Sequence, residues 1–295
     1  MDRRTFLVAG GVALVATSAL AATRKIDGSL PLIADSLHDT IARIEAESGG
    51  RLGVALHDTG TGQRFAYRGN EQFALCSTFK LLLAGAVLAR VRLGAERLDR
   101  SLPVRHSDVV ANSPFAARRA GGAATVGELC RAMVVESDNA AANLMLVAIG
   151  GPAALTRFLR QIGDAVTRLD SAEPLLGDVA PGDQRDSTTP LAMLGSAERL
   201  LVGPTLAPAD RARLTNWTIE CRTGLKRLRA GLPRGWRAGD KTGTGTHGTY
   251  NDVAIFWPPR RKPVLVTSYL AGSNLETAAG YAIHAKVARA VVARI

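Results

Sequence analysis

The first quarter of the chain changes from helical to strand-like periodicity. Apolar residues spaced three and four apart predict a helix over 29–47, which a pair of glycines ends. Alternating segments at 51–57 and 63–67 flank a glycine-containing turn. We therefore expect a helix followed by a β-hairpin.

The next hydrophobic segment is apolar on nearly every face. Between Phe79 and Leu88 the single charged side chain is Lys80. A helix without a polar face is usually buried. We expect a buried helix that runs to about Gly94, with Ser77 at its N-terminus facing a cleft.

The middle of the chain is mainly helical in pattern, with one long exception. Helical spacing between caps and glycine stops predicts helices at 125–135, 139–149, 152–163, 188–203 and 208–221. The first of these begins with a capping box made by Thr125 and Glu128. Segment 169–186 is rich in glycine, proline and charge, and its length is typical of a functional loop.

Strand alternation returns in the final third. It predicts strands at 236–244, 252–257 and 263–271, and a closing helix at 276–295. Strand-rich ends around a helical middle favour an α/β fold in two parts. We expect a discontinuous α/β domain formed by 23–75 and 222–295. A helical domain over 76–221 would contain the loop 168–186, with a cleft between the two domains.

Composition limits the partners of this chain. Its 295 residues are 46% hydrophobic, and 37 Lys and Arg exceed 26 Asp and Glu for a formal net charge of +11. The basic residues are scattered singly and in short pairs, so nucleic acid is not an expected partner. The five histidines lack ligand spacing, so neither a metal nor another cofactor is expected.

Residues 1–22 have the pattern of an export signal. Arg3 and Arg4 form a twin-arginine pair, an apolar run covers 8–16, and an A-x-A cleavage site ends at Ala21. The run is too short to span a membrane. We expect export by the twin-arginine route to a bacterial periplasm or the medium, without stable membrane association afterwards.

Candidate chemistry begins with Ser77 and Lys80, which would lie about one turn apart on the same face of a helix. A serine hydroxyl is a weak nucleophile until a neighbouring group takes its proton, and a lysine amine of lowered pKa can take part. Alone this spacing is common. Three further motifs give it weight, namely Ser137-Asp138-Asn139, Glu173-Pro174 and Lys241-Thr242-Gly243.

In this order the four motifs resemble those of class A serine β-lactamases. The resemblance covers nearly the whole mature chain. It implies the serine β-lactamase/penicillin-binding-like fold, an antiparallel five-stranded sheet flanked by helices together with an all-α domain. It also implies a monomeric hydrolase that opens the β-lactam amide of penicillins and cephalosporins and confers antibiotic resistance.

The resemblance assigns catalytic roles to four residues. Ser77 is the nucleophile that forms an acyl-enzyme. Lys80 and Glu173, the latter through a water, are the two candidates for activating it. Glu173 also activates the water that releases the acyl group, and Ser137 relays a proton to the departing lactam nitrogen.

The same resemblance implies the substrate-binding groups. Asn139 holds Lys80 and the side-chain amide of the substrate. Backbone N–H groups of Ser77 and Thr244 stabilise the oxyanion. β-Lactams carry a carboxylate, and the cationic, hydroxyl-bearing stretch expected to bind it is Lys241, Thr242, Gly243 and Thr244.

The sequence departs from the family in the walls of the cleft. Tyr250 stands where many members have an arginine that grips the substrate carboxylate. Some relatives use an arginine before the K-T-G strand, so Arg227 and Arg229 are candidates, and we favour Arg227. Asn112 replaces the aromatic residue that commonly walls the cleft.

The long loop departs as well. Gly177 replaces an asparagine that usually shares the hydrolytic water, and one lost hydrogen bond costs about 0.5–1.5 kcal/mol. Ser171 replaces the arginine that usually pairs with Asp186, which leaves Arg168 and Asp170 as tethers. We therefore expect a loop more mobile than is usual in the family.

The three cysteines are not expected to pair. In some relatives a cysteine at the position of Cys76 or Cys130 forms a disulfide. Here the partner positions hold Gly245 and Ala84, respectively. The third cysteine, Cys221, also has no expected partner.

Two other functions compete with the hydrolase. A D,D-peptidase-like cell-wall enzyme shares three of the motifs, but its relatives lack the loop that bears Glu173. A penicilloyl-accepting sensor would acylate without turnover, which Gly177 favours and Glu173 opposes. Burst kinetics would distinguish the three.

Overall fold

A computed structural model describes residues 32–177 and 182–295. Its largest element is a five-stranded antiparallel sheet in the order β2-β1-β9-β8-β7. In chain order the strands are β1 (Arg51–Asp58), β2 (Arg64–Tyr67), β7 (Arg237–Gly245), β8 (Thr249–Trp257) and β9 (Val264–Ala271). The expected sheet is therefore confirmed. The predicted export signal lies outside the described residues.

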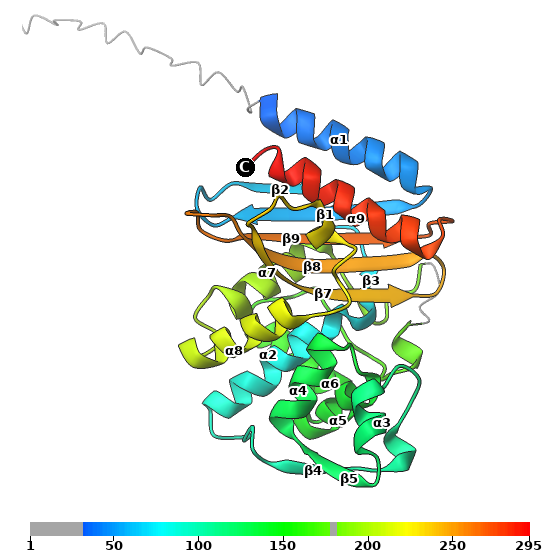
Figure 1. The fold of residues 1–295 in the computed structure, drawn as a ribbon, viewed down its shortest axis with the longest axis vertical. Coiled ribbons are helices and arrows are strands. Elements are labelled where there is room, and N and C mark those ends of the chain that lie inside the picture. Colours follow the sequence, from blue (N-terminus) through cyan, green and yellow to red (C-terminus); the bar gives the residue numbers. More distant parts are fainter. Residues whose placement is uncertain (1–31, 178–181) are drawn as a thin grey trace, which may run out of the picture.

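Two helices cover one face of the sheet, α1 (Leu32–Ser48) and α9 (Thr277–Val292) (Figure 1). Their apolar residues pack on alternate strand positions, including Ile41 against Leu52 and Val287 in one buried cluster. Gly49, in the left-handed conformation with φ of 61°, ends α1. This layer holds the sheet from the side away from the helical region.

The helical region lies against the other face (Figure 1). Its helices are α2 (Phe79–Arg92), α3 (Pro114–Arg119), α4 (Val126–Val135), α5 (Asn139–Ile149), α6 (Pro152–Gln161), α7 (Pro190–Leu201) and α8 (Pro208–Glu220). The predicted central helix α2 is buried from Phe79 to Leu88. Helices pack around it, which fixes the position of its N-terminal end.

Local capping signals explain the bounds of several helices. The Thr125 hydroxyl accepts a hydrogen bond from Glu128 N at 3.2 Å, and the Glu128 carboxylate accepts one from Thr125 N at 2.8 Å. This is the predicted capping box, and α4 follows it directly. At the end of α5, Gly150 has a φ of 101°, which a side chain would oppose.

The structure corrects two expectations. Ser77 does not start an α-helix, because it lies in a 3₁₀ turn over Cys76–Thr78, and α2 begins at Phe79. The structure also contains short strands that were not predicted. They pair as β4 (Ser101–Val104) with β5 (Gly122–Thr125) and as β3 (Phe73–Ala74) with β6 (Ser187–Thr188).

The β3–β6 pair matters for the site. It joins the segment just before Ser77 to the end of the long loop, and Leu75 N donates to Asp186 O at 2.7 Å. The loop itself contains a short 3₁₀ turn over Leu175–Gly177. Among the described residues, no single helix is long and apolar enough to cross a membrane.

Candidate active site

A cleft of about 570 Å³ opens beside the 3₁₀ turn that carries Ser77. It brings together the predicted residues Ser77, Asn112, Ser137, Asn139, Glu173, Arg227, Thr242 and Thr244. It is also lined by Pro174 of the Glu173-Pro174 motif, and by three residues that the sequence did not single out, Thr223, Thr246 and Tyr281. Lys80, Lys241 and Gly243 lie behind this lining.

Ser77 is presented by a tight backbone turn. The preceding Cys76 has a φ of 43°, in the left-handed region that a non-glycine residue seldom adopts. The Thr78 hydroxyl donates to Leu75 O at 2.6 Å and secures the turn from behind. The Ser77 hydroxyl therefore lies at the mouth of the cleft, while its two chain neighbours are buried.

Lys80 Nζ is the hub of the polar contacts. It donates to Ser77 Oγ at 2.9 Å, to Ser137 O at 2.8 Å and to Asn139 Oδ1 at 2.5 Å. It also forms an ion pair with Glu173 Oε1 at 3.0 Å. Burial lowers the pKa of this fully buried lysine, and the Glu173 charge opposes that effect. A lysine of lowered pKa can exchange a proton with Ser77.

Ser137 lies between two lysines. Lys241 Nζ donates to Ser137 Oγ at 3.0 Å, and Lys80 Nζ lies 3.5 Å from the same oxygen. Burial, together with the like charges of Lys80 and Arg227, lowers the pKa of Lys241 to about 8. The Ser137 hydroxyl is thus placed between two lysines whose pKa values are both lowered by burial.

Glu173 is fixed through its own backbone by a residue that the sequence reasoning missed. Asn143 Oδ1 accepts from Glu173 N at 3.0 Å, and Asn143 Nδ2 donates to Glu173 O at 2.9 Å. Glu173 Oε1 lies 3.5 Å from Ser77 Oγ. Asn143 follows Asn139 by four residues on α5, so its helical position, on the same face as a predicted site residue, was the available signal.

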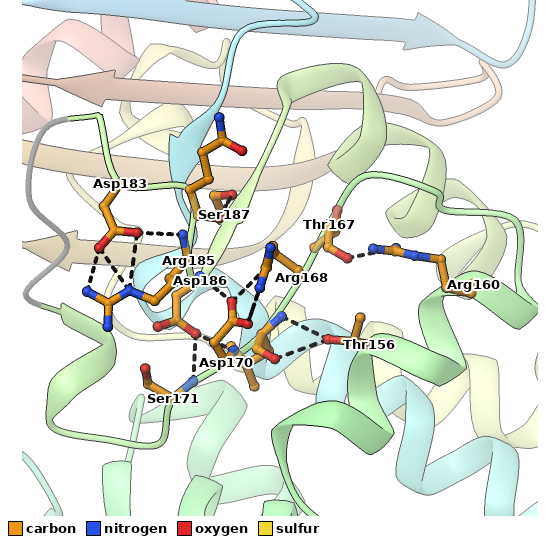
Figure 2. A network of polar contacts seen from close by, with 12 residues as sticks. Thr156, Arg160, Thr167, Arg168, Asp170, Ser171, Asp183, Arg185, Asp186 and Ser187 are labelled. Carbon is orange, nitrogen blue, oxygen red and sulfur yellow. Dashed lines mark hydrogen bonds and ion pairs between the residues drawn. The ribbon is translucent and has the colours of Figure 1, made fainter.

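The base of the loop is tied together by aspartates (Figure 2). Asp186 Oδ1 accepts from Asp170 N at 2.7 Å and from Ser171 N at 2.9 Å. In return Asp170 Oδ2 accepts from Asp186 N at 3.0 Å and pairs with Arg168. Arg168 and Asp170 are therefore part of the tether, as expected. Asp186 belongs to it because its carboxylate accepts hydrogen bonds from the backbone N–H groups of Asp170 and Ser171. The predicted mobility of the loop stays a prediction.

The two arginine candidates have different surroundings. Arg227 borders the cleft, whereas Arg229 pairs with the buried Asp240 of β7 and donates to two carbonyls of α8. Arg229 is therefore occupied by a structural contact. Of the two, the preferred candidate Arg227 is the one at the site.

Of the remaining departures from the family, Asn112 lies at the site, whereas Gly177 is not among the residues that line the cleft. Asn112 lines the cleft, and its Nδ2 donates to Ser137 O at 3.3 Å, so it supports the backbone of the Ser137 motif. Gly177 ends the 3₁₀ turn that follows Pro174. Position 112 therefore lacks the aromatic ring, and position 177 lacks the side-chain amide, that the family pattern predicts there.

The K-T-G strand lies close against the Ser77 turn, and Gly243 permits this. A Cβ there would lie 3.0 Å from both Cys76 Cβ and Leu75 O, so a side chain would push the strand away from Ser77. On the other face of the strand, the hydroxyls of Thr242 and Thr223 lie 2.6 Å apart. The strand thus aligns a row of hydroxyl groups along one side of the cleft.

The three cysteines are free and buried. Burial raises the pKa of the Cys76 thiol to about 12 and that of Cys221 to about 11. Neither thiol is therefore an available nucleophile at neutral pH. Within the described part of the chain, no group of three or more His, Cys, Asp or Glu residues is arranged to hold a metal ion.

Comparisons with known proteins agree with this geometry. Residues 36–295 match the model of the Beta-lactamase enzyme family. Over 300 residues the chain is 40% identical to β-lactamase L2 of Stenotrophomonas maltophilia, which covers 98% of this chain and 97% of that protein.

Solved structures of β-lactamases also resemble this chain. The ancestral class A β-lactamase GNCA matches with a TM-score of 0.87 and 56% identity, covering 88% of this chain and 100% of that chain. A β-lactamase from Xanthomonas campestris pv. campestris matches with a TM-score of 0.86 and 49% identity, covering 88% of this chain and 97% of that chain. These similarities extend over both the sheet and the helical region.

Proposed function

The chain belongs to the class A β-lactamases and hydrolyses the amide bond of β-lactams, and we propose that it does so through an acyl-enzyme on Ser77. One observation carries this assignment. Lys80 Nζ lies 2.9 Å and Glu173 Oε1 lies 3.5 Å from Ser77 Oγ at the wall of the cleft. A nucleophile beside groups that can take its proton is the arrangement that acyl transfer requires.

In the acylation step, Ser77 Oγ attacks the lactam carbonyl carbon. Its proton passes to the pair formed by Lys80 Nζ and Glu173 Oε1, which lie 3.0 Å apart. The negative charge on the carbonyl oxygen is stabilised by the backbone N–H groups of Ser77 and Thr244. One such donor is typically worth about 10²–10³-fold in kcat.

Cleavage of the C–N bond requires a proton on the departing nitrogen. Ser137 Oγ supplies it and recovers a proton from Lys241 or Lys80, whose Nζ atoms lie 3.0 and 3.5 Å away. Asn139 Oδ1 accepts a hydrogen bond from Lys80 Nζ and holds the lysine in place. The Asn139 amide N–H group donates to Ala111 O at 3.0 Å and lies at the edge of the cleft. The acyl group then remains on Ser77 as an ester.

Release of the ester requires an activated water, and Glu173 is the general base for it. The backbone clamp from Asn143 keeps that carboxylate beside Ser77. Gly177 offers no side-chain amide to share the water, so we expect slower deacylation of some substrates. Penicillins and cephalosporins are the proposed substrates, and their hydrolysis confers resistance.

The organisation of the whole chain completes the proposal. Segments 23–75 and 222–295 form the α/β domain and 76–221 the helical domain, with the cleft between them. Residues 1–22 direct export by the twin-arginine route, and the mature monomer acts in the periplasm or outside the cell. Support for this part comes from the sequence pattern and from the family.

Burst kinetics with nitrocefin test the proposal. Steady turnover beyond one equivalent is expected, and Ser77→Ala should abolish it. A single stoichiometric burst would indicate a penicilloyl-accepting sensor instead. Weak β-lactam turnover with faster cleavage of D-Ala-D-Ala peptides would indicate a peptidase.

A further inference from the structure

Arg227 is poorly placed to grip a substrate directly. Its side chain is 1% exposed. Its Nη1 donates to Gly243 O at 2.6 Å and to Asn251 O at 2.5 Å, and its Nη2 donates to Thr244 Oγ1 at 2.5 Å. Both Nη atoms are therefore committed to β7 and β8, and the charge lies beneath the cleft surface.

Tyr281, at the start of α9, covers this charge. The Arg227 Cζ lies 4.1 Å from the centroid of the Tyr281 ring, a stacked cation–π contact. Tyr281 is half-buried and lines the cleft together with Arg227 and Thr244. The outermost polar groups at this end of the cleft therefore include the hydroxyls of Tyr281 and Thr244.

The direction of the hydrogen bond between Arg227 and Thr244 leaves the Thr244 hydroxyl proton free for a substrate. A guanidinium can only donate, so Thr244 Oγ1 accepts from Arg227 Nη2. The Thr244 hydroxyl proton is not used in this bond, and the Tyr281 hydroxyl belongs to a residue that lines the same cleft. Burial raises the pKa of the Tyr281 hydroxyl, but the nearby charge of Arg227 lowers it overall. A more acidic hydroxyl is a stronger donor.

We propose that the Tyr281 hydroxyl binds the carboxylate of the β-lactam, and that Tyr281 and Thr244 transmit the charge of the buried Arg227 to it. This inference rests on the proposed function, because it concerns how the same substrate is recognised. It assigns a substrate contact to α9, an element that contributes no motif residue. It also gives Arg227 a positioning and electrostatic role in place of a direct grip.

The test compares Tyr281→Phe with the unchanged protein on a matched pair of substrates, benzylpenicillin and its methyl ester. The acid carries a charged carboxylate, whereas the methyl ester has a neutral group in its place. Loss of a hydrogen bond to a charged group should lower kcat/KM for the acid about tenfold, mainly through KM. For the ester the change should stay below about twofold.

Tyr250→Phe is the matched control. Tyr250 packs edge-on against Tyr281 with ring centroids 5.7 Å apart, but it does not line the cleft. Tyr250→Phe should leave kcat/KM unchanged for both substrates. Its melting temperature should be close to that of Tyr281→Phe.

Three outcomes would overturn the inference. They are equal losses on acid and ester, no loss on the acid, and a loss confined to kcat. The proposed function fails separately if the unchanged protein neither hydrolyses the acid nor forms an adduct on Ser77, and the inference would then fall with it.

Discussion

Lys80 Nζ and Glu173 Oε1 form a buried ion pair at 3.0 Å, and both contact Ser77 Oγ. Burying two charges is costly unless the remaining donors and acceptors are satisfied. Asn139 and Ser137 O satisfy the lysine, and Asn143 holds the backbone of the glutamate. The site is therefore a network in which removing one member leaves an uncompensated charge or donor.

Asn143→Ala should loosen Glu173. It removes two hydrogen bonds to the Glu173 backbone and leaves a partly buried N–H and C=O without partners. We expect about 1–3 kcal/mol lower stability per unsatisfied group, and slower deacylation than acylation. Denaturant melts and single-turnover kinetics measure the two effects. Unchanged stability with unchanged deacylation would contradict the clamp.

The dependence of kcat/KM on pH should reflect the titration of Lys241, whose pKa is lowered to about 8. Below that pH its charge attracts the substrate carboxylate, and above it the charge is lost. We therefore expect kcat/KM for benzylpenicillin to fall as the pH rises through about 8. Lys241→Arg keeps its charge throughout and should remove this fall, even at reduced activity. A native profile that stays flat to pH 10 would contradict the role of Lys241.

Asp186→Ala and Asp186→Asn distinguish the hydrogen bonds that the Asp186 side chain accepts from the effect of its negative charge. Asn keeps an oxygen that can accept from Asp170 N and Ser171 N, whereas Ala removes both bonds. Ala should lower stability by about 1–2 kcal/mol and speed hydrogen exchange of those two amides. Asp186→Asn should keep the stability and the hydrogen-exchange rates close to those of the unchanged protein. Equal effects of the two substitutions would show that charge, not backbone capping, holds the loop.

Thiol titration tests the cysteine assignment. The three cysteines are buried and free, and the pKa values of all three thiols are raised by burial. Folded protein should react slowly, and unfolded, unreduced protein should give three thiols. A count below three would mean that a disulfide exists after all.

Much of the fold was predictable from local signals. The Thr125–Glu128 box and the glycine at 150 mark helix ends within a few residues, because capping acts over one turn. The β4–β5 pair was missed because its strands are short and lie about twenty residues apart in the chain. Their pairing depends on contacts that no local pattern records.

The site divides in the same way. Ser77, Lys80 and Glu173 are found from motifs, because their chemistry restricts residue type and spacing. Tyr281 matters only through its ring over Arg227, and Arg227 is buried only because its donors meet the carbonyls of two strands. Such roles arise from tertiary packing, so they require the structure.

The central claim is that Glu173 is required to hydrolyse the acyl-enzyme, which accumulates without it. Glu173→Ala should still be acylated by benzylpenicillin but should lose deacylation by about 10²–10⁴-fold. Intact-protein mass spectrometry after mixing would then show a persistent adduct of one penicillin, absent when Ser77→Ala is added. Normal turnover by Glu173→Ala, with no accumulated adduct, would contradict the account.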